Sequence, residues 1–258
     1  MANFELDYRD REIILRMNEL TGEVIRLWYG LLKKSPATTA IGALFVRASA
    51  SWKSICMILL NCEDANEMRL CSNDVAALVR CMHDVCVQAE YIAASDPTEG
   101  LSADELGQLY LDFEHIERHR MAEKAVTLKS GVAKTIASSP HRPAGEARNQ
   151  REYDRVKSKY PDKRHWYRGT FVELAKKVDR EEDEFWFTKL LHSSIHGGPI
   201  SVVRGATIQG SVSLMVALQI MQRALQLVVK RDGIRLSDRS AEMMMKPIEV
   251  DLLDSATT

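Results

Sequence analysis

The chain has 258 residues, and its 35 Lys and Arg against 36 Asp and Glu give a formal net charge of -1 at pH 7. This near-balance excludes a uniformly basic nucleic-acid coat protein and an acidic disordered chain. Hydrophobic residues make up 45% of the sequence and charged residues 28%, which is typical of a soluble globular protein. A chain of this length can bury a sufficient core by itself. At this length the chain can form one large domain or two small ones. We expect a single domain over residues 1–258, and the patterns below predict that it is helical.

Targeting signals and cysteine motifs are missing from the sequence pattern. The first residues, MANFELDYRDRE, carry charges of both signs, which excludes a secretory signal. The most apolar stretch, 200–229, is interrupted by residues such as Arg204 and Arg223, so it falls short of a membrane span. The five cysteines form no CxxC pair, which excludes zinc-ribbon and thioredoxin sites and favours a reducing compartment. A cytoplasmic protein without a membrane segment is expected.

Helical periodicity dominates the first half of the chain. A first helix is expected over residues 7–34, and Ser35-Pro36 ends it. Its apolar stripe is Ile13, Met17, Leu20, Val24, Leu27 and Leu31. A second helix is expected to begin at Thr38 or Thr39. Its apolar side is Ile41, Leu44, Phe45, Ala48, Trp52, Ile55 and Leu59. A third is expected to begin near Ser72-Asn73-Asp74, whose side chains can cap free amides.

The second half contains one break in this pattern. The fourth helix is expected from about Ala103 toward Leu128, because Ser102 and Glu105 fit a capping box. Residues 138–169 hold several Pro and Gly, so a long basic connection around one short helix is expected. The remaining predicted segments are that short helix (144–159), helices over 170–178, 181–196 and 212–230, and an acidic, frayed tail (236–258). The last helix is apolar nearly all round, which predicts burial. Together these segments predict an all-α bundle of seven to nine helices.

Arg80, His83 and Asp84 form the first candidate site. On a helix, Arg80 and Asp84 are an i,i+4 pair, and His83 lies on a neighbouring face. The surrounding positions are apolar, so charges here would be partly desolvated and would need partners. The cluster is therefore either a functional polar group in a helical groove or a structural ion pair that orients two helices. Structural networks are the commoner explanation.

His192 and His196 form the second candidate, at i,i+4 just before Gly197-Gly198. Two imidazoles at this spacing can hold a metal or act as acid and base. No HExxH glutamate follows His192, so we expect no metal. The alternative is that these side chains cap the helix C-terminus. His115 and His119 share the same spacing, but their charged surroundings predict a solvated helix face.

The basic connection from Arg142 to Arg168 has a net charge of +5. Near its end, cations alternate with aromatic residues, a composition that single-stranded nucleic acid uses for phosphate contact and stacking. The candidate nucleic-acid-binding residues are Lys163, Arg164, Trp166 and Arg168. The alternative is a solvated loop whose Trp166 and Tyr167 anchor in the core. Phosphate-binding glycine loops and the GxSxG nucleophile motif do not occur, and no cofactor is expected.

The segments 79–84, 90–92 and 191–197 resemble a bacterial family of helical domains of unknown function. In that family an early helix carries Arg with an acid four residues later, a Trp-led helix follows, and a hydroxyl-rich segment ends in His-Gly. The matching positions here are Arg80, Asp84 (where the family more often has Glu), Trp166, Ser194, His196 and Gly197. The resemblance runs from the second helix to the last and implies no activity.

The chain is also loosely similar to the helical higher-eukaryote-and-prokaryote nucleotide-binding superfamily, many of whose members are defence or toxin ribonucleases. Those members carry an Arg and a His that are separated by four to six residues. Here only two residues separate Arg80 from His83, which puts ribonuclease activity in doubt. Arg80 and His196 could still meet from different helices.

Two functions remain as predictions. The favoured one is a non-catalytic helical interaction module in a bacterial cell, with a protein or RNA partner or a second copy of itself. The alternative is a stress or defence protein that binds or cleaves RNA. Its catalytic groove would contain Arg80, Asp84, His192 and His196.

Overall fold

The fold is helical throughout the part of the chain that the computed structural model describes, which is residues 8–30, 35–62, 65–127, 142–160, 165–184 and 206–245. These residues contain no strand, and the predicted all-α bundle is confirmed. The named elements within them are α1 (Tyr8–Tyr29), α2 (Pro36–Asn61), α3 (Ala65–Ala94), α4 (Ala103–Thr127), α6 (Arg142–Val156), the 3₁₀ helix η1 (Lys157–Lys159), α7 (Phe171–Lys177), α10 (Ala206–Asp232) and α11 (Asp238–Met245).

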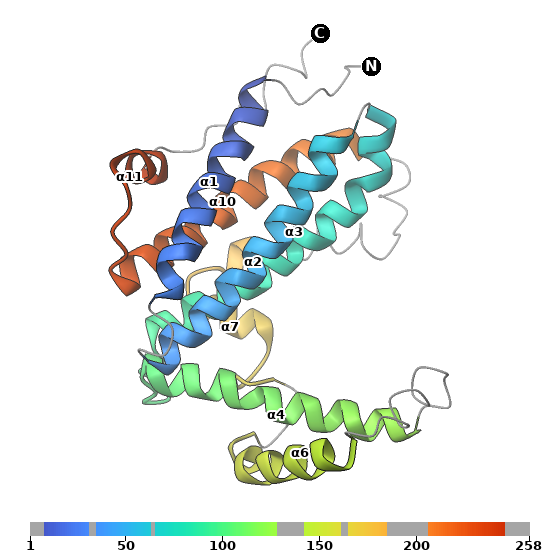
Figure 1. Cartoon of the computed structure of the whole chain (residues 1–258), viewed down its shortest axis with the longest axis vertical. Helices are drawn as coiled ribbons and strands as arrows, with labels where there is room; N and C mark the ends of the chain where they lie inside the picture. The colour runs from blue at the N-terminus through green and yellow to red at the C-terminus, as the bar shows by residue number, and fades with distance from the viewer. Residues whose placement is uncertain are drawn as a thin grey trace.

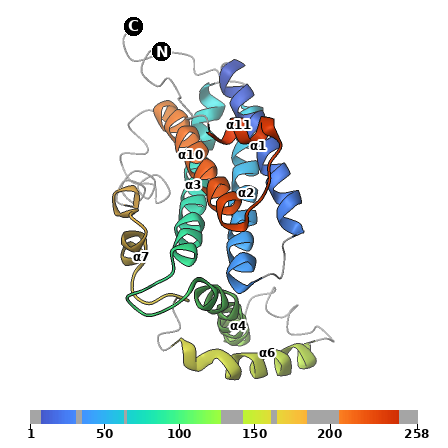
Figure 2. The ribbon, with the colours of Figure 1, turned by 90° about the vertical axis from the view of Figure 1, so that its left-hand side faces the viewer.

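Four long helices, α1, α2, α3 and α10, run side by side and enclose the core (Figures 1 and 2). Every apolar residue predicted for one side of α2 is buried. The predicted stripe of α1 is partly wrong, because Leu27 is exposed while Ile14 and Trp28 are buried. A helix turns 3.6 residues per turn, so the buried face of α1 continues from Val24 to Trp28.

Two predicted helix starts need correction. The second helix begins at Pro36 rather than at Thr38 or Thr39, because the Ser35 side chain accepts a hydrogen bond from the Thr38 amide and caps it. The third helix begins at Ala65, not near Ser72. Asn73 and Asp74 are exposed on the surface of this helix. Their polar side chains, which would also fit a helix cap, face solvent within the helix instead.

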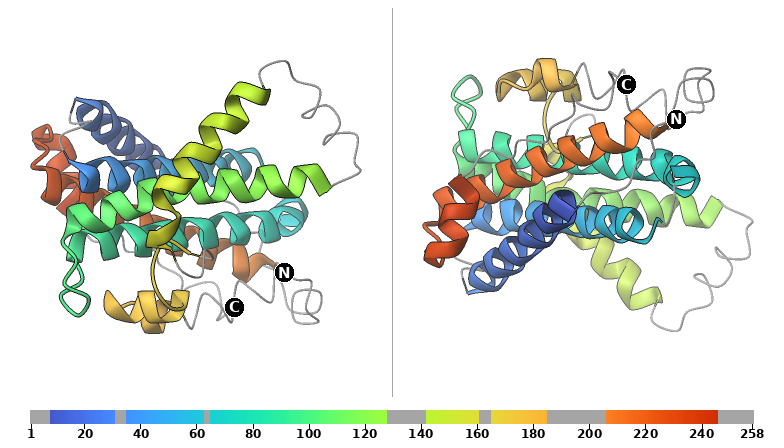
Figure 3. Two further views of the ribbon diagram at one scale, coloured as in Figure 1. Left: turned by 90° about the horizontal axis from the view of Figure 1, so that it is seen from below. Right: turned by 90° about the horizontal axis from the view of Figure 1, so that it is seen from above.

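Helix α4 crosses one end of the bundle, and α6 lies on the far side of α4 from it (Figures 1–3). The predicted Ser102–Glu105 capping box is present, with the Ser102 amide donating to Glu105 Oε2 at 2.8 Å. Asp112 on α4 is buried and holds α6 and η1 against α4, because Arg155 and Lys159 pair with its two oxygens at 3.3 and 2.8 Å. We call α4, α6 and η1 together the arm.

The C-terminal helices differ from prediction in three ways. Helix α10 begins at Ala206, and its exposed Gln219 and Gln226 show that one side of it faces solvent. Part of the predicted frayed tail is the helix α11, whose start is held by Glu23 of α1. Glu23 accepts hydrogen bonds from the Ser237 amide and from the hydroxyls of Ser237 and Ser240. Residues 246–258 of that tail lie outside the described residues.

Helix α2 is long and apolar enough to cross a membrane, and it is the one described helix that meets this test. Within its most apolar window, 44% is buried inside the protein. Its core face packs against α3 and α10. The cytoplasmic location therefore stays a prediction. All five cysteines are free thiols; Cys56 and Cys86 are buried in the core, and Cys81 is exposed.

Candidate functional site

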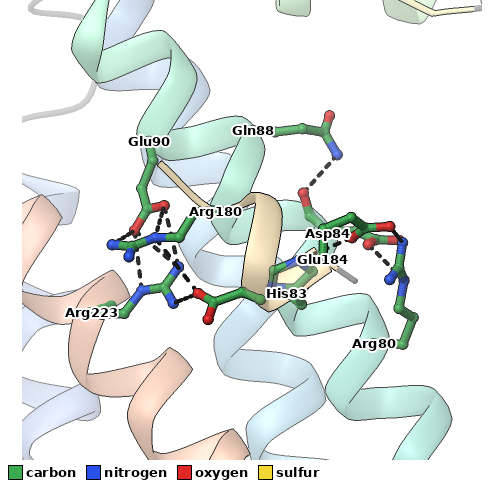
Figure 4. A network of polar contacts seen from close by, with 9 residues as sticks. Arg80, His83, Asp84, Gln88, Glu90, Arg180, Glu184 and Arg223 are labelled. Carbon is green, nitrogen blue, oxygen red and sulfur yellow. Dashed lines mark hydrogen bonds and ion pairs between the residues drawn. The ribbon is translucent and has the colours of Figure 1, made fainter. Parts of the chain in front are cut away.

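A group of ionisable side chains lies where α3, the helical turn 181–184 and α10 meet (Figure 4). We call it the charge cluster. Its members are Arg80, His83, Asp84, Glu90, Arg180, Asp183, Glu184 and Arg223. The α3 members follow one another at intervals of one to six residues, and the partners come from about 90 residues or more further along the chain.

Arg80 pairs with two carboxylates. Its Nε lies 2.9 Å from Asp84 Oδ1, which is the predicted i,i+4 pair. Its Nη2 donates to Glu184 Oε1, also at 2.9 Å. The Phe171 ring packs against the guanidinium at 5.5 Å from its centroid. Arg80 is therefore neutralised from two sides and covered on a third.

Glu184 was not predicted as a site residue, although only 5% of its side chain is exposed. It contacts both Arg80 and His83, with Oε2 at 3.2 Å from His83 Nε2. The sequence contained one indication of such a residue. Arg80 and His83 have apolar neighbours, and a buried charge needs an oppositely charged partner. Periodicity places residues within one helix, so it could not select Glu184 from the acids of residues 181–184.

His83 is fully buried. Burial lowers the pKa of its imidazole, and the hydrogen bond and charge of Glu184 oppose that shift without reversing it. A neutral ring beside a carboxylate carries its proton on Nε2 and donates it to Glu184. The edge of the ring also contacts Phe171, with centroids 6.2 Å apart.

Asp84 has the opposite shift. Its Oδ1 is buried beside Arg80, whereas 38% of the whole side chain is exposed. Burial raises the pKa of this carboxyl to about 6, in the face of the attraction of Arg80. Glu184, a second negative charge nearby, acts in the same direction as burial. Asp84 therefore exchanges its proton close to neutral pH.

The other half of the cluster is centred on Glu90. Arg180 binds its two carboxylate oxygens at 3.1 and 3.3 Å, and Arg223 of α10 binds them at 3.2 Å each. Arg223 also donates to Asp183 at 2.9 Å. These bidentate pairs connect α10 to α3 and to the turn 181–184. They are the stronger type of ion pair, since two parallel bonds fix the geometry.

The aromatic part of the predicted nucleic-acid segment packs against the same face of α3. Only 6% of Trp166 is exposed; its Nε1 donates to Gln88 at 2.7 Å, and its ring contacts Tyr91 and Tyr110. This is the geometry of the core-anchor alternative. Arg168 is exposed and pairs with Glu99 at 3.2 Å. Lys163 and Arg164 lie outside the described residues.

The predicted histidine sites have different outcomes. His192 and His196 lie outside the described residues, so their distance from Arg80 stays untested. His115 and His119 lie only partly on a solvated face, because α6 packs beside them and leaves 25% and 17% of their side chains exposed. His115 lies 4.0 Å from Glu152, and His119 stacks on Tyr153 at 3.8 Å. Among the described residues no group of three His, Cys, Asp or Glu side chains could hold a metal.

The charge cluster can hold helices together more readily than it can bind an anion. Its described members comprise four carboxylates against three guanidinium groups, with a neutral histidine between them. A phosphate would have to displace Glu184 from Arg80 and enter a site that already has an excess of negative charge. Pairing offsets much of the desolvation cost of buried charges, and removal of one partner is strongly destabilising because it leaves the other charge buried and uncompensated.

Comparison with known proteins gives one match. A family model described as "Family of unknown function (DUF5677)" matches residues 38–205, which span α2 to the segment before α10. No curated protein and no solved structure matches the chain.

Proposed function

Because this chain belongs to the family of unknown function DUF5677, whose description assigns no activity, we propose its function from the charge cluster. We propose a non-catalytic helical interaction module in a bacterial cell. In this proposal the cluster fixes the relative positions of α3, α10 and the turn 181–184, and the exposed helices bind a partner. The observation that carries it is the pairing of Arg80 with both Asp84 and Glu184.

Replacement of Arg80 tests this proposal. Arg80→Ala leaves the buried Glu184 carboxylate without its guanidinium, so the melting temperature should fall by roughly 5 °C or more. Arg118→Ala is the matched control, because Arg118 forms an exposed i,i+4 pair with Glu114 on α4. Exposed pairs contribute little, so the control should shift the melting temperature by about 1 °C or less. An unchanged melting temperature in Arg80→Ala would remove the structural role.

A second candidate is the stress or defence protein that binds or cleaves RNA at Arg80 and His196. It is favoured by one observation: Asp84 is partly exposed and has a pKa of about 6, as a proton acceptor would need. Labelled RNA incubated with the purified chain separates the two candidates. Cleavage that is lost in His196→Ala and in Asp84→Asn, while neither variant melts at a lower temperature than the wild type, would favour the second candidate over the first.

A further inference from the structure

The outer helix of the arm, α6, carries positive charge that nothing described in the protein neutralises. Three cations of α6 and η1 pair with acids. Lys157 pairs with Asp154, Arg155 and Lys159 pair with Asp112, and Glu152 also lies beside Arg155. Arg148 and Arg151 are different. Both are exposed, and within the described residues neither forms an ion pair with a carboxylate.

These two arginines lie on one face of the helix. A spacing of three residues places their side chains next to each other, and Arg155 continues the same face one turn further on. The opposite side of α6 is the buried one, because Tyr153 and Val156 are buried and Tyr153 stacks on His119 of α4. Helix α4 itself lies between α6 and the other long helices (Figures 1 and 2). Arg148 and Arg151 are therefore accessible to a large partner that approaches from outside.

The sequence around this face strengthens the charge. Residues 142–160, the described part that contains α6 and η1, have six Lys and Arg against three Asp and Glu, so this segment is +3 in a chain whose net charge is -1. The remainder of the chain is accordingly -4. A positive segment on a negative protein orients an approaching polyanion toward the arm.

The chemistry of the face selects one class of polyanion. The aromatic residues of this segment, Tyr153 and Tyr160, are buried against α4, so no described ring on the face is available to stack on an unpaired base. Among the side chains of α6 that the structure describes, none is the exposed large apolar type that a membrane-surface helix buries in lipid. Charge alone is what the phosphate backbone of a duplex requires.

We propose that the exposed face of α6 around Arg148 and Arg151 binds the phosphate backbone of duplex nucleic acid. Binding is independent of base sequence and is carried by guanidinium–phosphate contacts. The inference rests on the proposed function, since it names a partner for the interaction module. It uses the arm and not the charge cluster of the bundle.

The test measures binding of the full-length chain to a short duplex RNA, a duplex DNA of the same sequence and the corresponding single-stranded RNA. Fluorescence anisotropy is recorded between about 50 and 200 mM salt. Arg148→Gln/Arg151→Gln should weaken binding to both duplexes. For the DNA duplex, the plot of log affinity against log salt should become less steep by about 1.8, because each lost phosphate contact removes about 0.9 from the magnitude of its slope. A comparable loss of affinity for both duplexes indicates that the phosphate backbone common to them is recognised. A loss of affinity for one duplex alone identifies RNA or DNA as the partner.

The matched control is Arg16→Gln/Arg239→Gln, which removes two exposed arginines from α1 and α11 and the same net charge. It should leave the duplex affinity and the salt slope unchanged. The inference is wrong if the arm variant binds like the wild type, if no duplex binds at about 50 mM salt, or if single strands bind more tightly than duplexes. The melting temperature of Arg80→Ala tests the structural role of the charge cluster and does not depend on duplex binding by the arm. The two proposals can therefore fail independently of each other.

Discussion

Arg80 and Glu184 lie 104 residues apart in the chain, and their side chains form an ion pair with an N–O distance of 2.9 Å. The pair joins the middle of α3 to the turn 181–184. Glu90 makes the parallel connection from α3 to Arg180 and to Arg223 of α10. Only the folded bundle brings these segments together, so removal of one partner of a pair should lower the free energy of unfolding.

Asp84→Asn should stabilise the protein at pH 7. The folded-state pKa of about 6 lies above the ordinary value of 3.8. Between about pH 4 and pH 6 the folded state therefore holds a proton that the unfolded state releases, and stability from this group decreases as pH rises. Because 38% of the side chain is exposed, solvent screening limits the effect to roughly 1 kcal/mol. The melting temperature should rise by about 2–4 °C at pH 7.

The same variant should differ little from the wild type near pH 4, where the wild-type carboxyl is protonated as well. Calorimetry at the two pH values checks this. A lower melting temperature of Asp84→Asn at pH 7 would show that the attraction of Arg80 outweighs the cost of burying the carboxylate.

His83 should remain neutral below its ordinary pKa of 6.5, because burial lowers the pKa of the imidazole. The unfolded chain takes up this proton first as pH falls, so the contribution of His83 to stability decreases as pH falls below about 6.5. Imidazole NMR signals recorded across this range give the midpoint. In Glu184→Gln the midpoint should fall further, because Glu184 opposes the shift. A midpoint above the ordinary value in the wild type would refute this assignment.

Gly107→Ala should destabilise the contact between α2 and α4. A Cβ atom at Gly107 would lie 2.5 Å from the backbone of Ala37, so one helix would have to move. Overpacking of this kind costs roughly 1–3 kcal/mol. Gly22→Ala on α1 is the control, since the nearest atom to its Cβ is 4.0 Å away. The control should gain stability by up to about 1 kcal/mol through helix propensity. Denaturant titration measures both, and equal effects would contradict the close approach.

Asp112→Asn should loosen α6 from α4, because Asp112 is buried and accepts from Arg155 and Lys159. Burial raises the pKa of this carboxyl, but Lys159 and Gln108 lower it more, so the ionised form prevails. Hydrogen exchange of α6 amides should accelerate several-fold while α3 amides keep their rates. Asp154→Asn, at an exposed pair with Lys157, is the control. Uniform acceleration of both helices would contradict a local role.

The helical fold was predictable because periodicity and caps are local properties of the sequence. The burial of one side of α2 and the Ser102–Glu105 box follow from spacing alone. The start of α3 was mispredicted, because Ser72-Asn73-Asp74 fits a cap as well as an exposed helix face, and only the packing of α3 against its neighbours distinguishes them.

The candidate site was predictable only as far as one helix reaches. Arg80, His83 and Asp84 lie within five residues, and their spacing predicted an ion pair that is present. Glu184 and Arg223 come from distant segments, and their helical phase relative to α3 depends on tertiary packing. Trp166 shows the reverse problem: its neighbours suggested nucleic acid, whereas its ring contacts and hydrogen bond place it against α3.

A double-mutant cycle on Arg80 and Glu184 tests the central claim most directly. Unfolding free energies are measured for the wild type, Arg80→Ala, Glu184→Ala and the double variant. If the pair holds the bundle together, the double variant should be more stable than the sum of the single losses predicts, with a coupling energy of roughly 0.5–3 kcal/mol. Losses that add to within about 0.3 kcal/mol would contradict the account, because independent residues behave in that way.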